Sequence, residues 1–186
     1  MTVYEIRWHG RGGQGVVTAA QIFAEAAVKE GKYAVAIPHF GAERRGAPVV
    51  AYNRVSSTVI RSRASVKSPD AVVVLDPYLP SIVKVTEGLK EKGLIVLNAR
   101  KVEKQGFKGF RIAVVDATGI ALSLGLQLAG LALVNMPMLG ALVKASGIVD
   151  IQSVVDVVKK RWPGTLGDLN AKGILTAYEK TEVFGP

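Results

Sequence analysis

Three glycines spaced as Gly-x-Gly-x-x-Gly, at positions 10, 12 and 15, form the first pattern in the chain that suggests binding. They follow a β-rich stretch at 3–8 and precede a helical spacing of apolar residues at 16–30, so they mark a strand-to-helix turn. Glycine lets the backbone approach a ligand closely, and a helix N-terminus offers free N–H groups to an anion. The pattern predicts a phosphate-binding turn, although tight packing of a strand against a helix would also favour these glycines.

Two adjacent arginines, Arg44 and Arg45, stand in a glycine-flanked loop at 40–48. A guanidinium group can hold a phosphate through paired N–H donors. In a doubly wound sheet, the loops after the first and second strands lie at the same edge. We therefore expect the two arginines to lie near the glycine turn and to form an anion site with it. An exposed loop with ordinary surface charges is the alternative.

A dinucleotide-binding Rossmann domain is the main rival interpretation of the glycine turn. Such a domain places an acidic residue at the tip of the second strand, where it binds the ribose. Here the predicted second strand, 33–37, runs into Pro38 and His39. The missing carboxylate weakens this rival. A free-standing Rossmann-type nucleotide-binding oxidoreductase nevertheless stays as the alternative function.

Short apolar runs alternate with helical spacings along the rest of the chain. Further strands are expected at 49–55, 71–75, 94–97 and 111–115, and further helices at 80–91, 117–134, 136–145, 151–160 and 170–181. This order predicts an α/β three-layer sandwich, with a Rossmann-like, mainly parallel sheet and helices on both faces. The stretch 49–60 has no helix between its apparent strands, which predicts an antiparallel addition there. We expect residues 1–186 to form a single domain.

The composition limits which groups the chain can hold. It has 186 residues with no cysteine and only two histidines, so we expect it to hold no iron–sulfur cluster, zinc site or other metal. A net charge of +9 favours anionic partners. Nucleic acid is the weakest candidate among them, because no helix-turn-helix, RNP or zinc-finger pattern accompanies the charge. The opening residues include Glu5 and Arg7 and lack the apolar core of a secretory signal, so a cytoplasmic protein is expected.

The segment 117–143 carries no charge and is long enough to be a membrane span. Four recurring glycines, Gln127, Asn135 and Pro137 interrupt it, and no aromatic belt bounds it. These features favour two buried helices with a break near Asn135, and no membrane partner. So apolar a segment also suits a contact with another subunit.

Three runs of the sequence resemble the gamma subunits of 2-oxoacid:ferredoxin oxidoreductases, of the pyruvate and 2-oxoisovalerate type. They lie at 6–20, 40–49 and 135–142, and read IRWHGRGGQGVVTAA, FGAERRGAPV and NMPMLGAL. The resemblance implies a fold like the third domain of single-chain pyruvate-ferredoxin oxidoreductases. It also implies a subunit that does not act alone but supports the coenzyme A-dependent oxidative decarboxylation of pyruvate to acetyl-CoA, with electrons passed to ferredoxin.

The same resemblance assigns the cofactors and partners. Thiamine diphosphate and the iron–sulfur clusters would belong to partner subunits, named alpha, beta and delta in this family, and ferredoxin would be met only indirectly. This chain would supply no catalytic residue. It would share a coenzyme A site, and the residues carried over to that site are Gly10, Arg11, Gly12, Gly13, Gln14, Gly15, Arg44 and Arg45.

Overall fold

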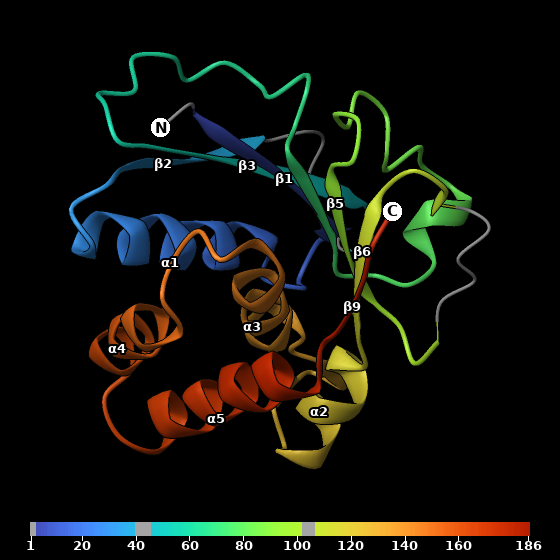
Figure 1. Ribbon diagram of the computed structural model, residues 1–186. Helices are drawn as coiled ribbons and strands as arrows, with labels where there is room; N and C mark the ends of the chain where they lie inside the picture. Colours follow the sequence, from blue (N-terminus) through green and yellow to red (C-terminus); the bar gives the residue numbers. More distant parts are fainter. Residues whose placement is uncertain (1–2, 40–45, 102–106) are drawn as a thin grey trace.

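A seven-stranded sheet forms the centre of the protein in the computed structural model, which describes residues 3–39, 46–101 and 107–186 (Figure 1). The strand order is β2-β3-β1-β4-β5-β6-β9. The strands are β1 (Tyr4–Arg11), β2 (Tyr33–His39), β3 (Pro48–Ser56), β4 (Ala71–Val74), β5 (Leu94–Asn98), β6 (Arg111–Val115) and β9 (Glu182–Phe184). Neighbours from β1 to β6 are parallel, and β3 is antiparallel to both β1 and β2. The α/β class, the mainly parallel sheet and the antiparallel addition are confirmed.

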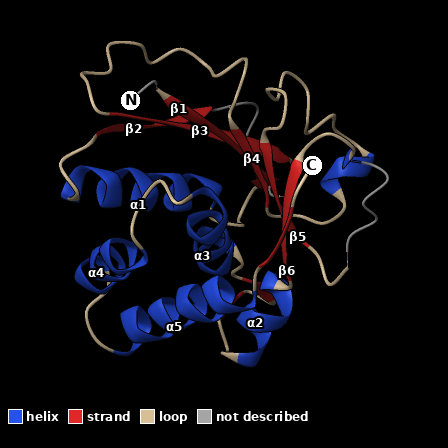
Figure 2. Cartoon of the chain, in the orientation of Figure 1, coloured by secondary structure: helices blue, strands red, loops and turns tan. Residues whose placement is uncertain are grey.

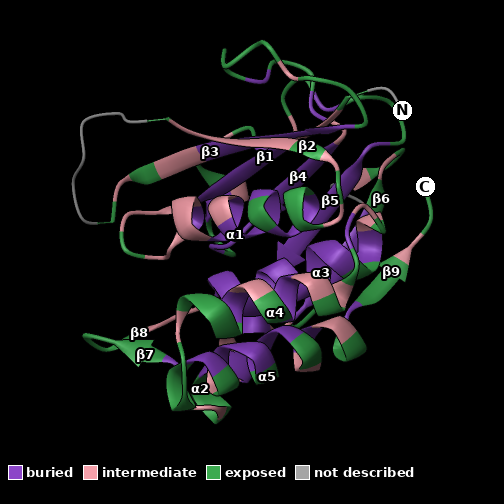
Figure 3. Ribbon diagram, turned by 90° about the vertical axis from the view of Figure 1, so that its left-hand side faces the viewer, coloured by how far each residue is buried: buried purple, intermediate pink, exposed green. Residues whose placement is uncertain are grey.

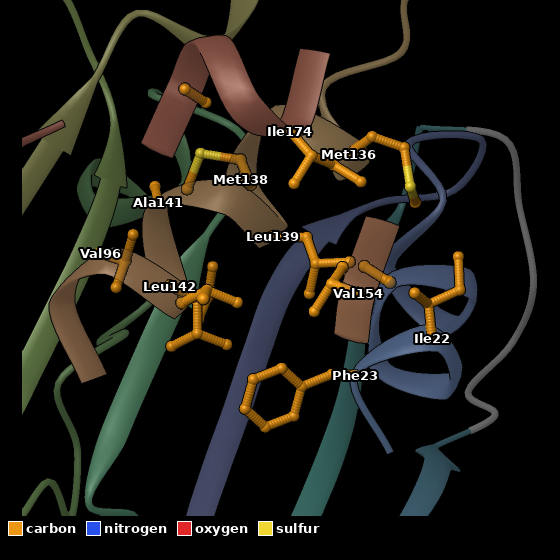
Figure 4. Close-up of a cluster of buried hydrophobic side chains, with 14 of the residues drawn as sticks. Ile22, Phe23, Val96, Met136, Met138, Leu139, Ala141, Leu142, Val154 and Ile174 are labelled. Carbon is orange, nitrogen blue, oxygen red and sulfur yellow. The ribbon is translucent and has the colours of Figure 1, made fainter. Parts of the chain in front are cut away.

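The α-helices gather below the sheet in the view of Figure 2, where α1, α3, α4 and α5 cover one face. They are α1 (Val16–Lys29), α2 (Ala117–Ser123), α3 (Asn135–Ser146), α4 (Ile151–Arg161) and α5 (Thr165–Lys180). Helix α3 is almost wholly buried, because the sheet and α5 enclose it (Figure 3). Side chains from α1, α3, α4, α5 and β5 meet around it, including Phe23, Leu139 and Ile174 (Figure 4).

The opposite face of the sheet is covered mainly by irregular chain. A second apolar cluster there joins β4, β5 and β6 to Leu79, Val85 and Leu89. Within residues 57–101, this layer contains one short 3-10 helix, η1 (Leu79–Ser81). The second helical layer is thus thinner than that of a sandwich with full helices on both faces.

The helix predicted at 80–91 is wrong, and a buried arginine explains why. Val85 and Leu89 do face the sheet, but the backbone after η1 forms turns. The Arg7 guanidinium on β1 is 9% exposed and donates to the carbonyl oxygens of Val85 and Glu87. A helix would use those same carbonyls for its own N–H groups four residues later. A buried cation must be hydrogen-bonded, so tertiary structure overrides the local pattern.

In the uncharged segment 117–143, the second expected helix, at 136–145, is confirmed as α3, whereas the first is shorter than expected. Helix α2 ends at Ser123, and a hairpin of β7 (Gln127–Leu128) and β8 (Leu131–Ala132) follows. The predicted break near Asn135 is confirmed, because α3 begins there. Among the residues that the structure describes, no helix is long and apolar enough to cross a membrane. Helix α5 begins at Thr165, five residues earlier than predicted, and the short strand β9 was not predicted.

His9 on β1 makes the stability depend on pH. Burial, and secondarily the nearby Arg7 charge, lower the pKa of His9 from 6.5 to about 4. Its Nε2 accepts a hydrogen bond from Arg7 Nε at 3.0 Å, which only a neutral imidazole can do. The unfolded chain therefore binds the proton more readily than the folded one between pH 6.5 and 4, and folding stability falls as the pH falls through that window.

We expect a His9→Gln variant to lose this dependence, because glutamine keeps an acceptor for Arg7 but does not titrate. Between pH 7 and pH 5, the free energy of unfolding of the wild type should fall by about 2 kcal/mol more than that of the variant. Urea denaturation at the two pH values measures the difference. Equal losses in both proteins would show that His9 is not the titrating group.

Candidate functional site

The glycine turn joins β1 to α1, and its conformation requires glycine at specific positions. Gly13 and Gly15 have positive φ angles of 94° and 75°, in the region that disfavours side chains. A side chain on Gly10 would meet Val16 Cγ2 at 2.4 Å, so this glycine allows the strand and the helix to pack closely. Gln14 closes the turn, because its Oε1 accepts a hydrogen bond of 2.7 Å from the backbone N–H of Arg11.

Arg11 ties the glycine turn to two other segments. Its Nε lies 2.7 Å from Asp76 Oδ2, directly after β4, and its Nη1 donates to the Gly46 carbonyl oxygen at 3.1 Å. Backbone hydrogen bonds also join the turn to the segment at Gly46: Gly12 N donates to Ala47 O at 2.9 Å, and Gly46 N donates to Gly12 O at 3.4 Å. Arg11 therefore has a carboxylate and a carbonyl as partners already, and the geometry suits it to positioning the turn.

Arg44 and Arg45, the other predicted anion-binding residues, lie outside the described residues. The described chain resumes at Gly46, the residue that follows Arg45 in the sequence. The hydrogen bonds of Gly46 and Ala47 to Gly12 bring this end of the loop directly against the glycine turn.

The third of the runs that resemble the family, at 135–142, also contacts the glycine turn. Asn135, the first residue of α3, is 8% exposed, and its Nδ2 lies 3.4 Å from the carbonyl oxygen of Gly15. A side chain on Gly15 would meet that amide nitrogen at 2.3 Å. Parts of three runs that are far apart in the sequence thus meet at one place.

The place where they meet is a switch point of the sheet. After β1 the chain passes to α1 on the helical face and on toward β2, whereas after β4 it passes to η1 on the opposite face and on toward β5. Strands β1 and β4 are parallel neighbours, so their outgoing connections diverge and leave a crevice at their carboxyl ends. The ion pair between Arg11 and Asp76 spans this crevice. Ligands of open α/β sheets bind at such crevices.

A cleft of about 620 Å³ extends along this edge of the sheet. The glycine turn contributes Gln14 to its wall, and the loops after β4 and β5 contribute Tyr78, Arg100 and Lys101. Leu131 of the β7–β8 hairpin closes one side. The cleft thus combines an anion-compatible turn, two basic side chains and apolar walls.

Two polar residues at this edge hold the loops in place. Asn98 is 3% exposed, and its Nδ2 donates to Leu75 O at 2.8 Å and to Thr118 Oγ1 at 3.0 Å. Asp116 caps α2 through Gly119 N at 2.7 Å, and its Oδ2 lies 3.2 Å from Arg100 Nε. Sequence analysis missed both residues, and Asp76 as well. Their position in the sequence could have indicated them, because each of the three residues directly follows or ends a buried apolar run.

Within 3–39, 46–101 and 107–186, no cluster of three or more histidine, aspartate or glutamate residues could hold a metal ion. The carboxylates in the cleft wall, Asp76 and Asp116, are each paired with an arginine.

Comparison with known proteins places the chain in a family. Residues 5–180 match the family model described as pyruvate ferredoxin/flavodoxin oxidoreductase. The chain is 50% identical over 185 residues to the pyruvate/ketoisovalerate oxidoreductases common subunit gamma of Pyrococcus furiosus, covering 97% of this chain and 98% of that protein. It is 48% identical over 181 residues to the pyruvate synthase subunit PorC of Methanothermobacter marburgensis, covering 97% and 99%.

Solved structures agree with this placement. The pyruvate oxidoreductase subunit PORC of Thermotoga maritima (EC 1.2.7.1) superposes with a TM-score of 0.84 at 38% identity, covering 98% of this chain and 99% of that one. A 2-oxoglutarate:ferredoxin oxidoreductase chain from Magnetococcus marinus superposes with a TM-score of 0.73 over 30% of its length. At 18% identity that likeness concerns the fold alone. The chain therefore belongs to the pyruvate ferredoxin/flavodoxin oxidoreductase family, as a gamma subunit of a 2-oxoacid:ferredoxin oxidoreductase.

Proposed function

We propose that this gamma subunit binds the phosphates of coenzyme A with its glycine turn and the paired arginines Arg44 and Arg45, within a complex that oxidises pyruvate to acetyl-CoA. The observation that carries the proposal is a pair of backbone hydrogen bonds: Gly12 N–H donates to the carbonyl oxygen of Ala47, and Gly46 N–H donates to that of Gly12. Gly46 is the residue that follows Arg45 in the sequence.

The chemistry of the parts supports this assignment. Coenzyme A carries a diphosphate and a 3′-phosphate, which suit guanidinium groups and the N–H groups at a helix N-terminus. Helix α1 begins directly after the turn and has no acidic residue in its first turn. Gly10, Gly12, Gly13, Gln14 and Gly15 would shape the turn, and Arg11 would hold it against Asp76.

The reacting groups are assigned to partners. Thiamine diphosphate would activate the 2-oxoacid, and iron–sulfur clusters would pass electrons to ferredoxin, both held by the alpha, beta and delta subunits. This chain would bind and orient the acyl acceptor at the edge of that shared site. A single domain over 1–186 and a cytoplasmic location stay predictions from the sequence.

The rival function, a free-standing Rossmann oxidoreductase, is not favoured. Strand β2 ends at His39, and none of its seven residues is acidic. The ribose-binding carboxylate of a dinucleotide domain is therefore missing from the strand tip. The family match covers most of the chain and points to a complex rather than to a lone dehydrogenase.

The test uses the co-expressed, affinity-purified complex with an Arg44→Ala/Arg45→Ala double substitution. Each lost charge-assisted contact is worth about 1.5–3 kcal/mol, so the KM for coenzyme A should rise at least tenfold, while kcat at saturating coenzyme A stays near that of the wild type. A matched control is Arg61→Ala/Arg63→Ala, which removes two exposed arginines from the loop after β3, at the opposite edge of the sheet. The site assignment fails if both variants keep the wild-type KM in a complex of normal subunit composition.

A further inference from the structure

The β7–β8 hairpin presents two leucines to solvent. Leu128 is 66% exposed and Leu131 is 44% exposed, and Figure 3 shows the hairpin extending away from the helices. Single exposed leucines are common on protein surfaces. Two exposed leucines on one protruding hairpin, however, form an apolar surface. The proposed binding of a ligand in the cleft does not explain why this surface is exposed.

The hairpin is held rigidly. Its two turn residues, Ala129 and Gly130, have φ angles of 48° and 78°, and positive φ at both positions matches the natural twist of a hairpin. At its base, Leu126 N donates to Ala121 O at 2.9 Å and Leu133 N donates to Leu126 O at 2.8 Å. Leu126 is itself part of the buried core. These contacts hold the backbone that carries the two leucines, which lowers the entropy lost on binding.

The stretch of sequence that contains the hairpin carries no charge. No charged residue occurs between Ala117 and Val143, in a chain that has 39 charged residues from 24 basic and 15 acidic ones. The exposed residues of this segment include Leu122, which is 47% exposed on the neighbouring helix α2. Depletion of charge around apolar anchors is the composition found at the centre of protein interfaces.

We propose that this hairpin is the docking element for a sister subunit of the oxidoreductase complex, with Leu128 and Leu131 inserted into an apolar groove of that subunit. The proposal rests on the chain being a gamma subunit and not on the coenzyme A site. A second copy of this chain is a poor occupant, because two chains of net charge +9 repel each other.

The charged residues near the hairpin indicate which charges the partner should carry. Arg100, which is 82% exposed along its side chain, and Lys101 line the same cleft as Leu131. A groove with carboxylates on its rim would meet these cations while its apolar floor takes the leucines. A subunit seated there would lie over the mouth of the cleft, beside Gln14 of the glycine turn.

The test introduces Leu128→Asp/Leu131→Asp into the co-expressed complex, with the sister subunits carrying the affinity tag. We expect at least a tenfold loss of this chain from the purified complex. The matched control is Val28→Asp/Leu166→Asp, two apolar residues that are 54% and 50% exposed elsewhere, and it should co-purify like the wild type. A milder Leu128→Ser/Leu131→Ser variant should also be recovered in smaller amounts than the control. Circular dichroism of each isolated chain checks its folding.

Normal recovery of a folded hairpin variant would overturn the proposal, as would an equal loss from the control. So would a wild-type chain that is dimeric in isolation and becomes monomeric when the hairpin is changed, because the occupant would then be a second copy. The arginine variants test coenzyme A binding in an assembled complex. The two proposals can therefore fail separately.

Discussion

Replacing Gly140 with alanine is expected to lower the free energy of unfolding by about 3 kcal/mol. Gly140 lies in α3 where α5 crosses it, and a Cβ atom there would stand 2.1 Å from the carbonyl oxygen of Ile174. That oxygen belongs to a helix backbone and cannot rotate away. Helix α3 cannot retreat either, because it packs against the sheet on its other side (Figure 4). The two helices must therefore separate, at a cost that exceeds the gain in helix propensity from alanine.

A matched control lies on α5. A Cβ atom on Gly173 would first meet Leu126 Cδ1 at 3.1 Å, the end of a flexible side chain. Gly173→Ala should therefore change the stability by less than about 1 kcal/mol, in either direction. Urea denaturation of both variants measures the difference. Similar stabilities would mean that the close contact between α3 and α5 is not as tight as described.

Removing the side-chain amide of Asn53 is expected to cost about 3 kcal/mol as well. Asn53 on β3 is fully buried, and its Oδ1 accepts a hydrogen bond of 2.7 Å from Trp8 Nε1. Its Nδ2 donates to Ala20 O in α1 at 2.9 Å and to Val35 O in β2 at 3.2 Å. One amide thus links three strands and a helix. An Asn53→Leu variant would keep the volume but leave the indole N–H buried without an acceptor.

A double-mutant cycle isolates the bond to the tryptophan. In a Trp8→Phe background the unsatisfied N–H is already gone, so Asn53→Leu should cost less there, by about 1–2 kcal/mol. Thermal and urea denaturation of the four proteins provide the cycle. Strictly additive losses would show that the hydrogen bond to Trp8 does not contribute and that Asn53 acts through its other contacts.

The strands were predictable from sequence because they are continuous apolar runs, and burial on both faces requires such runs. Runs 71–75, 94–97 and 111–115 all became neighbouring parallel strands. The segment after Leu79 was not predictable, because its apolar spacing is helical while its carbonyls bind Arg7 from a strand some 78 residues earlier. Local periodicity contains no information about such a distant donor.

The hairpin within the uncharged segment 117–143 was missed for a different reason. Its apolar residues suit a buried helix, yet Leu128 and Leu131 lie on an exposed hairpin. Periodicity assumes that apolar residues face the core of the same chain. A subunit that buries leucines in a neighbour breaks that assumption, which is consistent with the docking role proposed for the hairpin.

At the site, the glycine turn was placed correctly by its spacing, whereas Asp76, Asn98 and Asp116 were missed. The glycine pattern is local, so a few consecutive residues of the sequence are enough to identify it. The missed residues gather only because parallel strands end at the same edge, and this requires the strand order. The family resemblance assigned Arg11 to ligand binding; its guanidinium is bound to Asp76 in the structure, and the ligand-binding role stays a prediction.

The most direct test of the central claim compares two thiol acceptors in the assembled complex. Coenzyme A carries the phosphates that Arg44 and Arg45 are proposed to bind, whereas pantetheine carries the same thiol without them. The double alanine variant should lose at least tenfold in kcat/KM with coenzyme A and should match the wild type with pantetheine. Equal losses with both acceptors, or no loss with either, would contradict a phosphate-binding role for this edge of the sheet.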